Sequence, residues 1–136
     1  AELVWLLDLE SPEGAIERVT HSRGPGNVVL VKLMLETHTE VFSGFGRMGV
    51  PASKVAAEAA LQVNEYLETP KASVSRRLAD QLLIPMAMAG EGTFRTGPLS
   101  RHTTTNKEVI QGFMDVAIET REHARGWVDV HVGSRD

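Results

Sequence analysis

The 136-residue sequence contains no cysteine. Zinc sites built on thiolates, iron–sulfur clusters, disulfide scaffolds and cysteine nucleophiles are therefore excluded together. Long apolar runs are missing too, since the longest cover residues 3–7, 28–35 and 82–89, and a bilayer crossing needs roughly 20 residues. The N-terminal residues also lack the basic stretch and apolar centre of a signal peptide. We expect a cytoplasmic protein that has no membrane partner.

Positive charge is in the minority, because 14 lysines and arginines stand against 18 aspartates and glutamates, for a formal net charge of −4. Binding of nucleic acid through bulk charge needs clustered cations, so only recognition of a nucleic-acid end stays open. Hydrophobic residues make up 42% of the chain and charged residues 24%, as in globular proteins with a buried core. An apolar segment begins at once and no initiating Met precedes it, so we expect a piece of a longer polypeptide.

The apolar pattern predicts an α+β fold. Strands are predicted over residues 2–10, 28–36, 39–43, 93–96, 116–121 and 126–132, and helices over residues 53–69, 74–89 and 106–114. Apolar residues occupy both faces of the strand at 28–36, which predicts that both faces are covered. The polar link at His38 favours an antiparallel hairpin. Ser75 and Gly90 are the predicted caps of the second helix, and residues 70–73 are the best internal boundary.

Residues 44–49 match the G-x-G-x-x-G pattern of dinucleotide-binding loops. Such a site needs a helix that begins within the glycines and a carboxylate at the end of a strand about 20 residues further on. Pro51 and Ser53 place the helix start later, and the segment that should hold the strand is predicted to be helical. We therefore expect an ordinary loop here, and no stabilisation of the protein by NAD.

Thr105 and Glu108 fit a capping box that opens the helix predicted over residues 106–114. His102 then lies just before a helix N-terminus, where unpaired backbone amides and the positive end of the helix dipole favour phosphate. Three cations are close to it in sequence: Arg95, Arg101 and Lys107. A neutral imidazole in such a place can act as a nitrogen nucleophile. A histidine within a run of hydroxyl residues is more often a surface loop residue, so the spacing alone favours that interpretation and leaves the nucleophile as the alternative.

Residues 82–89 are apolar around the whole helix circumference, so we expect this end of the helix to be buried. Asp80 lies above the stripe that should face the core, and it needs a partner because an unpaired buried charge is costly. Arg76 and Arg77, at helical spacings of four and three, are the simplest partners. A ligand is the alternative partner, and Gln81 adds a second polar group beside Asp80.

No other residue pattern indicates a catalytic or metal site. Ser43 and Ser100 lack the G-x-S-x-G frame of a nucleophile elbow. Glu119 and Glu122 are expected on the exposed face of a terminal hairpin. Four further histidines have no metal-ligand spacing, so we expect no metal site built by the chain itself: His21, His38, His123 and His131.

Three segments, LADQLLIPMAMAG at residues 78–90, TGP at 96–98 and HTTTN at 102–106, occur in this order. Together they resemble the C-terminal part of the RNA 3'-terminal phosphate cyclases. Residues 24–27 and 46–55 look like that family as well, so the resemblance runs along nearly all of the chain. It implies that residues 1–72 finish a small inserted α/β domain, and that residues 73–136 form the last βαβ-type repeat of the large catalytic domain.

The resemblance also implies a ligase-type activity that uses ATP to convert an RNA 3'-terminal phosphate into a 2',3'-cyclic phosphodiester. In the family, a histidine at the position of His102 takes AMP from ATP and releases pyrophosphate. The AMP then passes to the RNA 3'-phosphate, and the neighbouring 2'-hydroxyl displaces it. A divalent cation, usually magnesium, assists. The nucleotide site is implied to include Arg77, Leu78, Ala79, Asp80 and Gln81.

The sequence departs from the family pattern in two ways. Family members commonly carry an aromatic residue where this chain has Arg77, so base stacking would become guanidinium stacking or be lost. They are also more than twice as long, and their N-terminal portion, which supplies further active-site residues, is an expected partner here. The alternative is a non-catalytic cyclase-like protein that acts in RNA binding or ribosome assembly. Such relatives lack the histidine, so His102 favours the enzyme.

Overall fold

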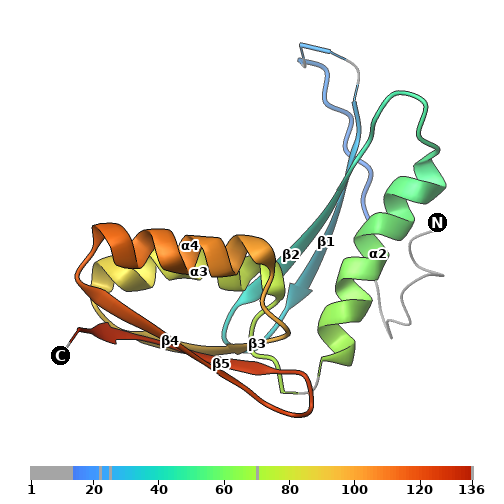
Figure 1. Cartoon of the computed structure of the whole chain (residues 1–136). Coiled ribbons are helices and arrows are strands. Elements are labelled where there is room, and N and C mark those ends of the chain that lie inside the picture. Colours follow the sequence, from blue (N-terminus) through green and yellow to red (C-terminus); the bar gives the residue numbers. More distant parts are fainter. Residues whose placement is uncertain (1–13, 22, 25, 70, 136) are drawn as a thin grey trace. The chain divides into compact units, whose positions relative to one another are not determined.

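The computed structural model describes residues 14–21, 23–24, 26–69 and 71–135. Its elements are β1 (Val28–Met34), β2 (Thr39–Phe45), α2 (Ala52–Glu68), α3 (Arg76–Ala89), β3 (Gly92–Thr96), α4 (Arg101–Phe113), β4 (Val116–Glu122) and β5 (Val128–Ser134) (Figure 1). Helices combined with antiparallel sheets confirm the predicted α+β class. The strand predicted over residues 2–10 lies outside the described residues. Contacts divide the chain into two units, residues 1–65 and 66–136.

In the first unit, β1 and β2 form the predicted antiparallel hairpin, in which Val31 lies opposite Phe42. Helix α2 packs beside β2, where the Gln62 side chain donates a 3.1 Å hydrogen bond to the Ser43 carbonyl. The two elements come closest at Gly44, because a Cβ atom there would lie 2.4 Å from the carbonyl oxygen of Val55. The absence of a side chain at this position therefore lets the helix and the strand approach.

No element among the described residues covers the other face of the hairpin, contrary to the prediction that both faces of the strand at residues 28–36 are covered. Apolar side chains on this face are exposed, namely Val28, Leu30, Met34, Val41 and Phe45. Within this unit α2 lies on one side of the hairpin only. The sequence pattern showed that both faces of the strand carry apolar side chains. In the described part of the unit, however, only one of these faces is covered, by α2.

Residues 44–49 do not have the geometry of a dinucleotide-binding loop. Gly44 lies inside β2, the chain turns at Met48 and Gly49, and α2 begins only at Ala52. Gly49 has a φ of 78°, the left-handed region that glycine adopts readily. The helix therefore begins after the last glycine, as predicted.

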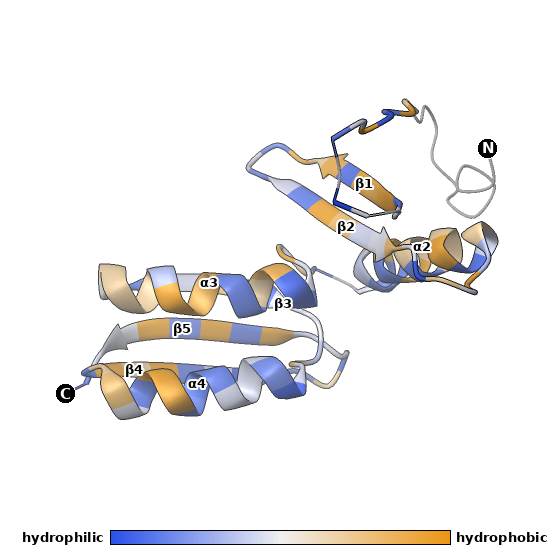
Figure 2. Ribbon diagram, turned by 90° about the horizontal axis from the view of Figure 1, so that it is seen from above, coloured by the Kyte–Doolittle hydropathy of each residue, from blue (hydrophilic) through white to orange (hydrophobic). Residues whose placement is uncertain are grey.

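In the second unit, the sheet has the order β3-β5-β4, and β5 is antiparallel to both neighbours. β3 and β4 consequently run parallel, with α4 connecting them and β5 inserted between them, which is a split βαβ arrangement. Helices α3 and α4 cover one face of this sheet (Figure 2). The core between helices and sheet consists of Val74, Ala79, Leu83, Ala87, Phe94, Ile110, Val116, Ile118, Val128, Val130 and Val132.

Helix α3 begins and ends where its caps predict. The Ser75 hydroxyl accepts a hydrogen bond from the backbone N–H of Leu78 at 3.1 Å, and Gly90 has a φ of 83°. The prediction that residues 82–89 are buried all round is wrong, however. Leu83 faces the core, whereas Ile84 and Met88 are 53% and 75% exposed. A helix that packs on a sheet through one face leaves its opposite face outside.

Candidate active site

Helix α4 begins at Arg101 rather than at residue 106. Ser100 is its N-cap, because the Ser100 hydroxyl accepts a 3.1 Å hydrogen bond from the backbone N–H of Thr103. The two side-chain oxygens of these residues lie 2.8 Å apart, and Thr103 is only 2% exposed, so the first turn is anchored in the unit. The capping box predicted at Thr105 and Glu108 is wrong, since both residues already lie inside the helix.

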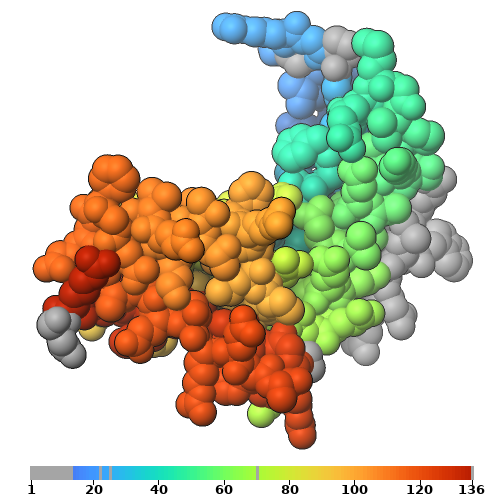
Figure 3. Space-filling view, in the orientation of Figure 1, coloured from blue at the N-terminus to red at the C-terminus, as the bar shows by residue number. Residues whose placement is uncertain are grey.

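His102 is the second residue of α4, so it lies in the first helical turn and not before it. Its side chain is exposed and makes no hydrogen bond with any residue that the structure describes. Helix α4 lies at the surface of the second unit in the space-filling view (Figure 3). The helix terminus still offers a positive field and backbone N–H groups to an anion, as expected from the sequence.

Two of the three cations expected near His102 are engaged with the sheet instead. Arg95 forms a bidentate ion pair with Asp129 on β5, in which Nη2 lies 3.0 Å from Oδ2. The Lys107 ammonium lies 3.2 Å from the Thr120 hydroxyl on β4. Arg101 remains as an exposed neighbour of His102 on α4. Of the three cations, only Arg95 is neutralised by a carboxylate that the structure describes, so the helix terminus, Arg101 and the charge of Lys107 supply the positive field on this helix.

The five residues implied in nucleotide binding occupy the first two turns of α3, and they differ in burial. Ala79 is fully buried and Leu78 packs against the core, so these two fix the helix on the sheet. Arg77 and Gln81 are exposed, and Asp80 is half-buried. The side chains that a ligand can reach are therefore the polar ones.

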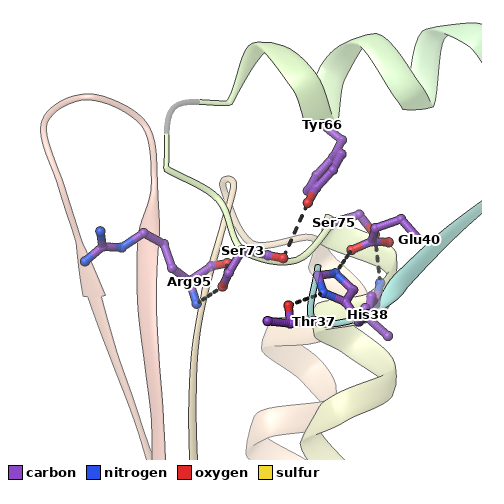
Figure 4. A network of polar contacts seen from close by, with 8 residues as sticks. Thr37, His38, Glu40, Tyr66, Ser73, Ser75 and Arg95 are labelled. Atoms are coloured by element: carbon purple, nitrogen blue, oxygen red, sulfur yellow. Dashed lines mark hydrogen bonds and ion pairs between the residues drawn. The ribbon is translucent and has the colours of Figure 1, made fainter. Parts of the chain in front are cut away.

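The segment that leads into α3 is fastened to β3 by Ser73 (Figure 4). Its hydroxyl donates to the Arg95 carbonyl at 2.9 Å and accepts from the Arg95 N–H at 3.0 Å. The Tyr66 hydroxyl in turn donates to the Ser73 carbonyl at 3.4 Å. These bonds fix the N-terminus of α3 relative to the sheet.

Asn106 links the two helices at the site. Its side-chain amide donates a 2.8 Å hydrogen bond to Oδ1 of Asp80. Among the described residues Asp80 forms no ion pair with Arg76 or Arg77, contrary to the prediction. Asn106 lies four residues after His102, one helical turn further on, and both residues share one side of α4. Asn106 was not among the site residues predicted from the sequence, although its spacing of four residues from His102 was visible.

A second cluster of charged groups lies on the face of the sheet that points away from the helices. Hydrogen bonding to Arg95, with a smaller contribution from His123, lowers the pKa of Asp129 to about 2. The same bond raises the pKa of Arg95. The His123 ring stacks on Trp127 with centroids 5.3 Å apart, and Lys71 lies 5.4 Å from the indole centroid. Arg95 and His123 both bond to Asp129, which is typical of a structural cluster, whereas the buried indole N–H of Trp127 has no hydrogen-bond partner in the part of the chain that the structure describes.

His38 is bonded to neighbouring polar side chains and is not part of a metal site formed by the described residues. His38 lies between the Thr37 hydroxyl at 3.1 Å and a Glu40 carboxylate oxygen at 3.3 Å (Figure 4). Within the described ranges, no group of three or more His, Cys, Asp or Glu residues could hold a metal ion. No helix in the same part of the chain is long and apolar enough to cross a membrane.

Comparison with known proteins places these features in a family. The family model described as RNA 3'-terminal phosphate cyclase matches residues 14–120. Proteins named RNA 3'-terminal phosphate cyclase are similar to the chain, with 39% identity over 117 residues in Koribacter versatilis, 46% over 98 in Pseudomonas fluorescens and 42% over 113 in Salmonella paratyphi C. These alignments cover 86%, 72% and 83% of the chain but 33%, 28% and 32% of the relatives, so the chain spans about a third of their length. The chain belongs to the RNA 3'-terminal phosphate cyclase family.

Proposed function

We propose that this chain is the C-terminal part of an enzyme that uses ATP to convert an RNA 3'-terminal phosphate into a 2',3'-cyclic phosphodiester. The observation that supports this best is the exposed His102 in the first turn of α4. One turn further along the same helix, Asn106 is bonded to the segment implied in nucleotide binding. A candidate nucleophile and a candidate nucleotide site therefore belong to neighbouring helices.

The proposed chemistry has three steps. A ring nitrogen of His102 attacks the α-phosphorus of ATP, the bond to the β-phosphate oxygen breaks, and pyrophosphate leaves. An oxygen of the RNA 3'-phosphate then attacks the same phosphorus, which releases the imidazole and forms an RNA–AMP anhydride. Finally, the 2'-hydroxyl attacks the 3'-phosphorus, loses its proton and expels AMP, so that the ring closes.

The helix terminus contributes electrostatics to the first step. Negative charge accumulates on the α-phosphate as the nitrogen approaches, and fixed N–H groups aimed at developing charge are an effective form of catalysis. The first turn of α4 and the exposed Arg101 supply such positive groups beside His102.

The nucleotide is proposed to lie across the first turns of α3 and α4. The Arg77 guanidinium can stack on the base where other family members have an aromatic ring. Asp80 offers carboxylate oxygens and Gln81 an amide, whereas Leu78 and Ala79 hold the helix in the core. Guanidinium stacking depends less on the identity of the base than hydrogen bonding does, so Arg77 would bind the nucleotide without strong base selection.

Magnesium is proposed to accompany ATP. It usually binds through one or two carboxylates together with substrate phosphates. Among the described residues, no three His, Cys, Asp or Glu side chains form a cluster that could bind it, so the ATP phosphates would supply most of its ligands. The proposed partners are an RNA 3'-phosphate end and the N-terminal portion of the enzyme, and the cytoplasmic location stays a prediction.

The test uses the full-length protein that contains this chain, incubated with magnesium and α-labelled ATP. We expect an acid-labile label on the wild type and none on His102→Ala. The matched control is His131→Ala, which removes another exposed histidine of the same unit and should leave labelling unchanged. Labelling or RNA cyclisation at the wild-type rate in His102→Ala would contradict the proposal and favour a non-catalytic cyclase-like role.

A further inference from the structure

We infer that Asn106 is a positioning residue of the nucleotide site, which holds the Asp80 carboxylate toward the helix that carries His102. The inference rests on the proposed function and extends it to a residue outside the five implied in nucleotide binding. Its basis is the 2.8 Å hydrogen bond from Asn106 Nδ2 to Asp80 Oδ1, between two half-buried side chains on different helices.

The choice of partner matters for the Asp80 carboxylate. Arg76 and Arg77 precede Asp80 by four and three residues, so either could reach the carboxylate along the same helix. Such an ion pair would turn the carboxylate toward the start of α3 and neutralise its charge. The neutral amide of Asn106 instead fixes one oxygen and leaves the negative charge in place. A carboxylate accepts several hydrogen bonds, so Asp80 can still accept one from a donor on a bound nucleotide.

The bond also fixes the position of the Asp80 carboxylate relative to His102, the proposed nucleophile. Side chains on a helix lean toward its N-terminus, so Asn106 extends over the turn that carries His102. Any shift of Asp80 relative to Asn106 therefore changes the distance between the nucleotide segment and the attacking nitrogen. Displacements of about 1 Å can slow group transfer by two orders of magnitude.

A purely structural role is less consistent with the packing. Leu83 of α3 and Ile110 of α4 are 1% and 6% exposed and belong to one apolar core. This core already holds both helices on the sheet, farther along from the site. The polar pair therefore adds little that the core does not supply, except a defined orientation of the carboxylate.

The test measures equilibrium binding of ATP with magnesium to the full-length protein in a His102→Ala background, where no adenylate can form. Asn106→Ala, Asp80→Ala and the double variant are compared. We expect Asn106→Ala to weaken binding about tenfold, as for a lost hydrogen bond to a charged group. The double variant should bind no more weakly than Asp80→Ala alone, because the effect of Asn106 acts through Asp80.

Two further variants separate positioning from folding. Asn106→Asp keeps the shape but replaces the donor by a like charge, so it should weaken binding at least as much as Asn106→Ala. Thr105→Ala removes an exposed polar group next to Asn106 and should change nothing. Three results would each overturn the inference. The first is unchanged ATP affinity in Asn106→Ala together with a lowered unfolding temperature. The others are additive effects in the double variant and no ATP binding by the His102→Ala background. An unlabelled wild-type His102 overturns the proposed function separately, because labelling does not involve these variants.

Discussion

The side-chain amide of Asn106 on α4 donates a 2.8 Å hydrogen bond to the carboxylate of Asp80 on α3, across 26 residues of sequence. The bond joins the two segments that carry the strongest family resemblance. One contains the residues implied in nucleotide binding, and the other begins with His102. Both lie at the starts of their helices, where anions are favoured.

Replacement of Ser100 by alanine tests where α4 begins. Ser100→Ala leaves the backbone N–H of Thr103 without its side-chain acceptor, so the free energy of unfolding should fall by about 1 kcal/mol. Thr105→Ala is the matched control, since Thr105 lies inside the helix and its loss should be nearly neutral. Urea unfolding followed by circular dichroism measures both. A larger decrease in the free energy of unfolding for Thr105→Ala than for Ser100→Ala would indicate that the helix begins at residue 106.

Two glycine-to-alanine changes should have opposite effects. Gly44→Ala places a Cβ atom 2.4 Å from the Val55 carbonyl oxygen, so it should destabilise the first unit by about 1–3 kcal/mol. Gly112→Ala meets no atom within 4 Å and lies in α4, where the better helix propensity of alanine should stabilise the chain by up to about 1 kcal/mol. Thermal unfolding of the two variants gives the signs, and a neutral or stabilising effect of Gly44→Ala would contradict the close approach of β2 and α2.

The ion pair of Asp129 should make stability depend on acid. The pKa of Asp129 is lowered from 3.8 to about 2 in the folded chain, chiefly by its hydrogen bond to Arg95. The unfolded chain therefore takes up this proton first, and the stabilisation present above pH 3.8 is lost as the pH falls toward 2.

Asp129→Asn should reduce this acid dependence, measured as the change in unfolding temperature between pH 5 and 2, roughly the range in which such carboxylates titrate. Glu119→Gln is the control, because Glu119 is exposed on β4 and forms no ion pair among the described residues. An equal acid dependence in wild type and Asp129→Asn would show that the pair does not contribute.

Features that depend on local sequence were predictable. Ser75 and Gly90 bracket α3 because a side-chain oxygen and a left-handed glycine act within one turn of the chain. The start of α4 was not predictable, because both Ser100 and Thr105 are residue types that commonly cap a helix N-terminus. Burial of Thr103 favours the first of them, and that burial is a consequence of tertiary packing.

The partners of charged side chains were the least predictable part of the site. Arg95 pairs with Asp129 because the register of β3 and β5 places them opposite each other, which no local pattern indicates. Asp80 bonds to Asn106 rather than to its helical neighbours because α3 and α4 pack together. His102 was predicted from its position and from the family resemblance, and its role stays a prediction with which its exposure agrees.

Peptide mass analysis of the full-length protein after incubation with ATP and magnesium tests the adenylate mechanism most directly. The mechanism predicts one AMP on the peptide that contains His102, lost on brief treatment with acid. AMP on another residue such as Lys107, or an unmodified protein under conditions in which RNA ends are cyclised, would contradict it.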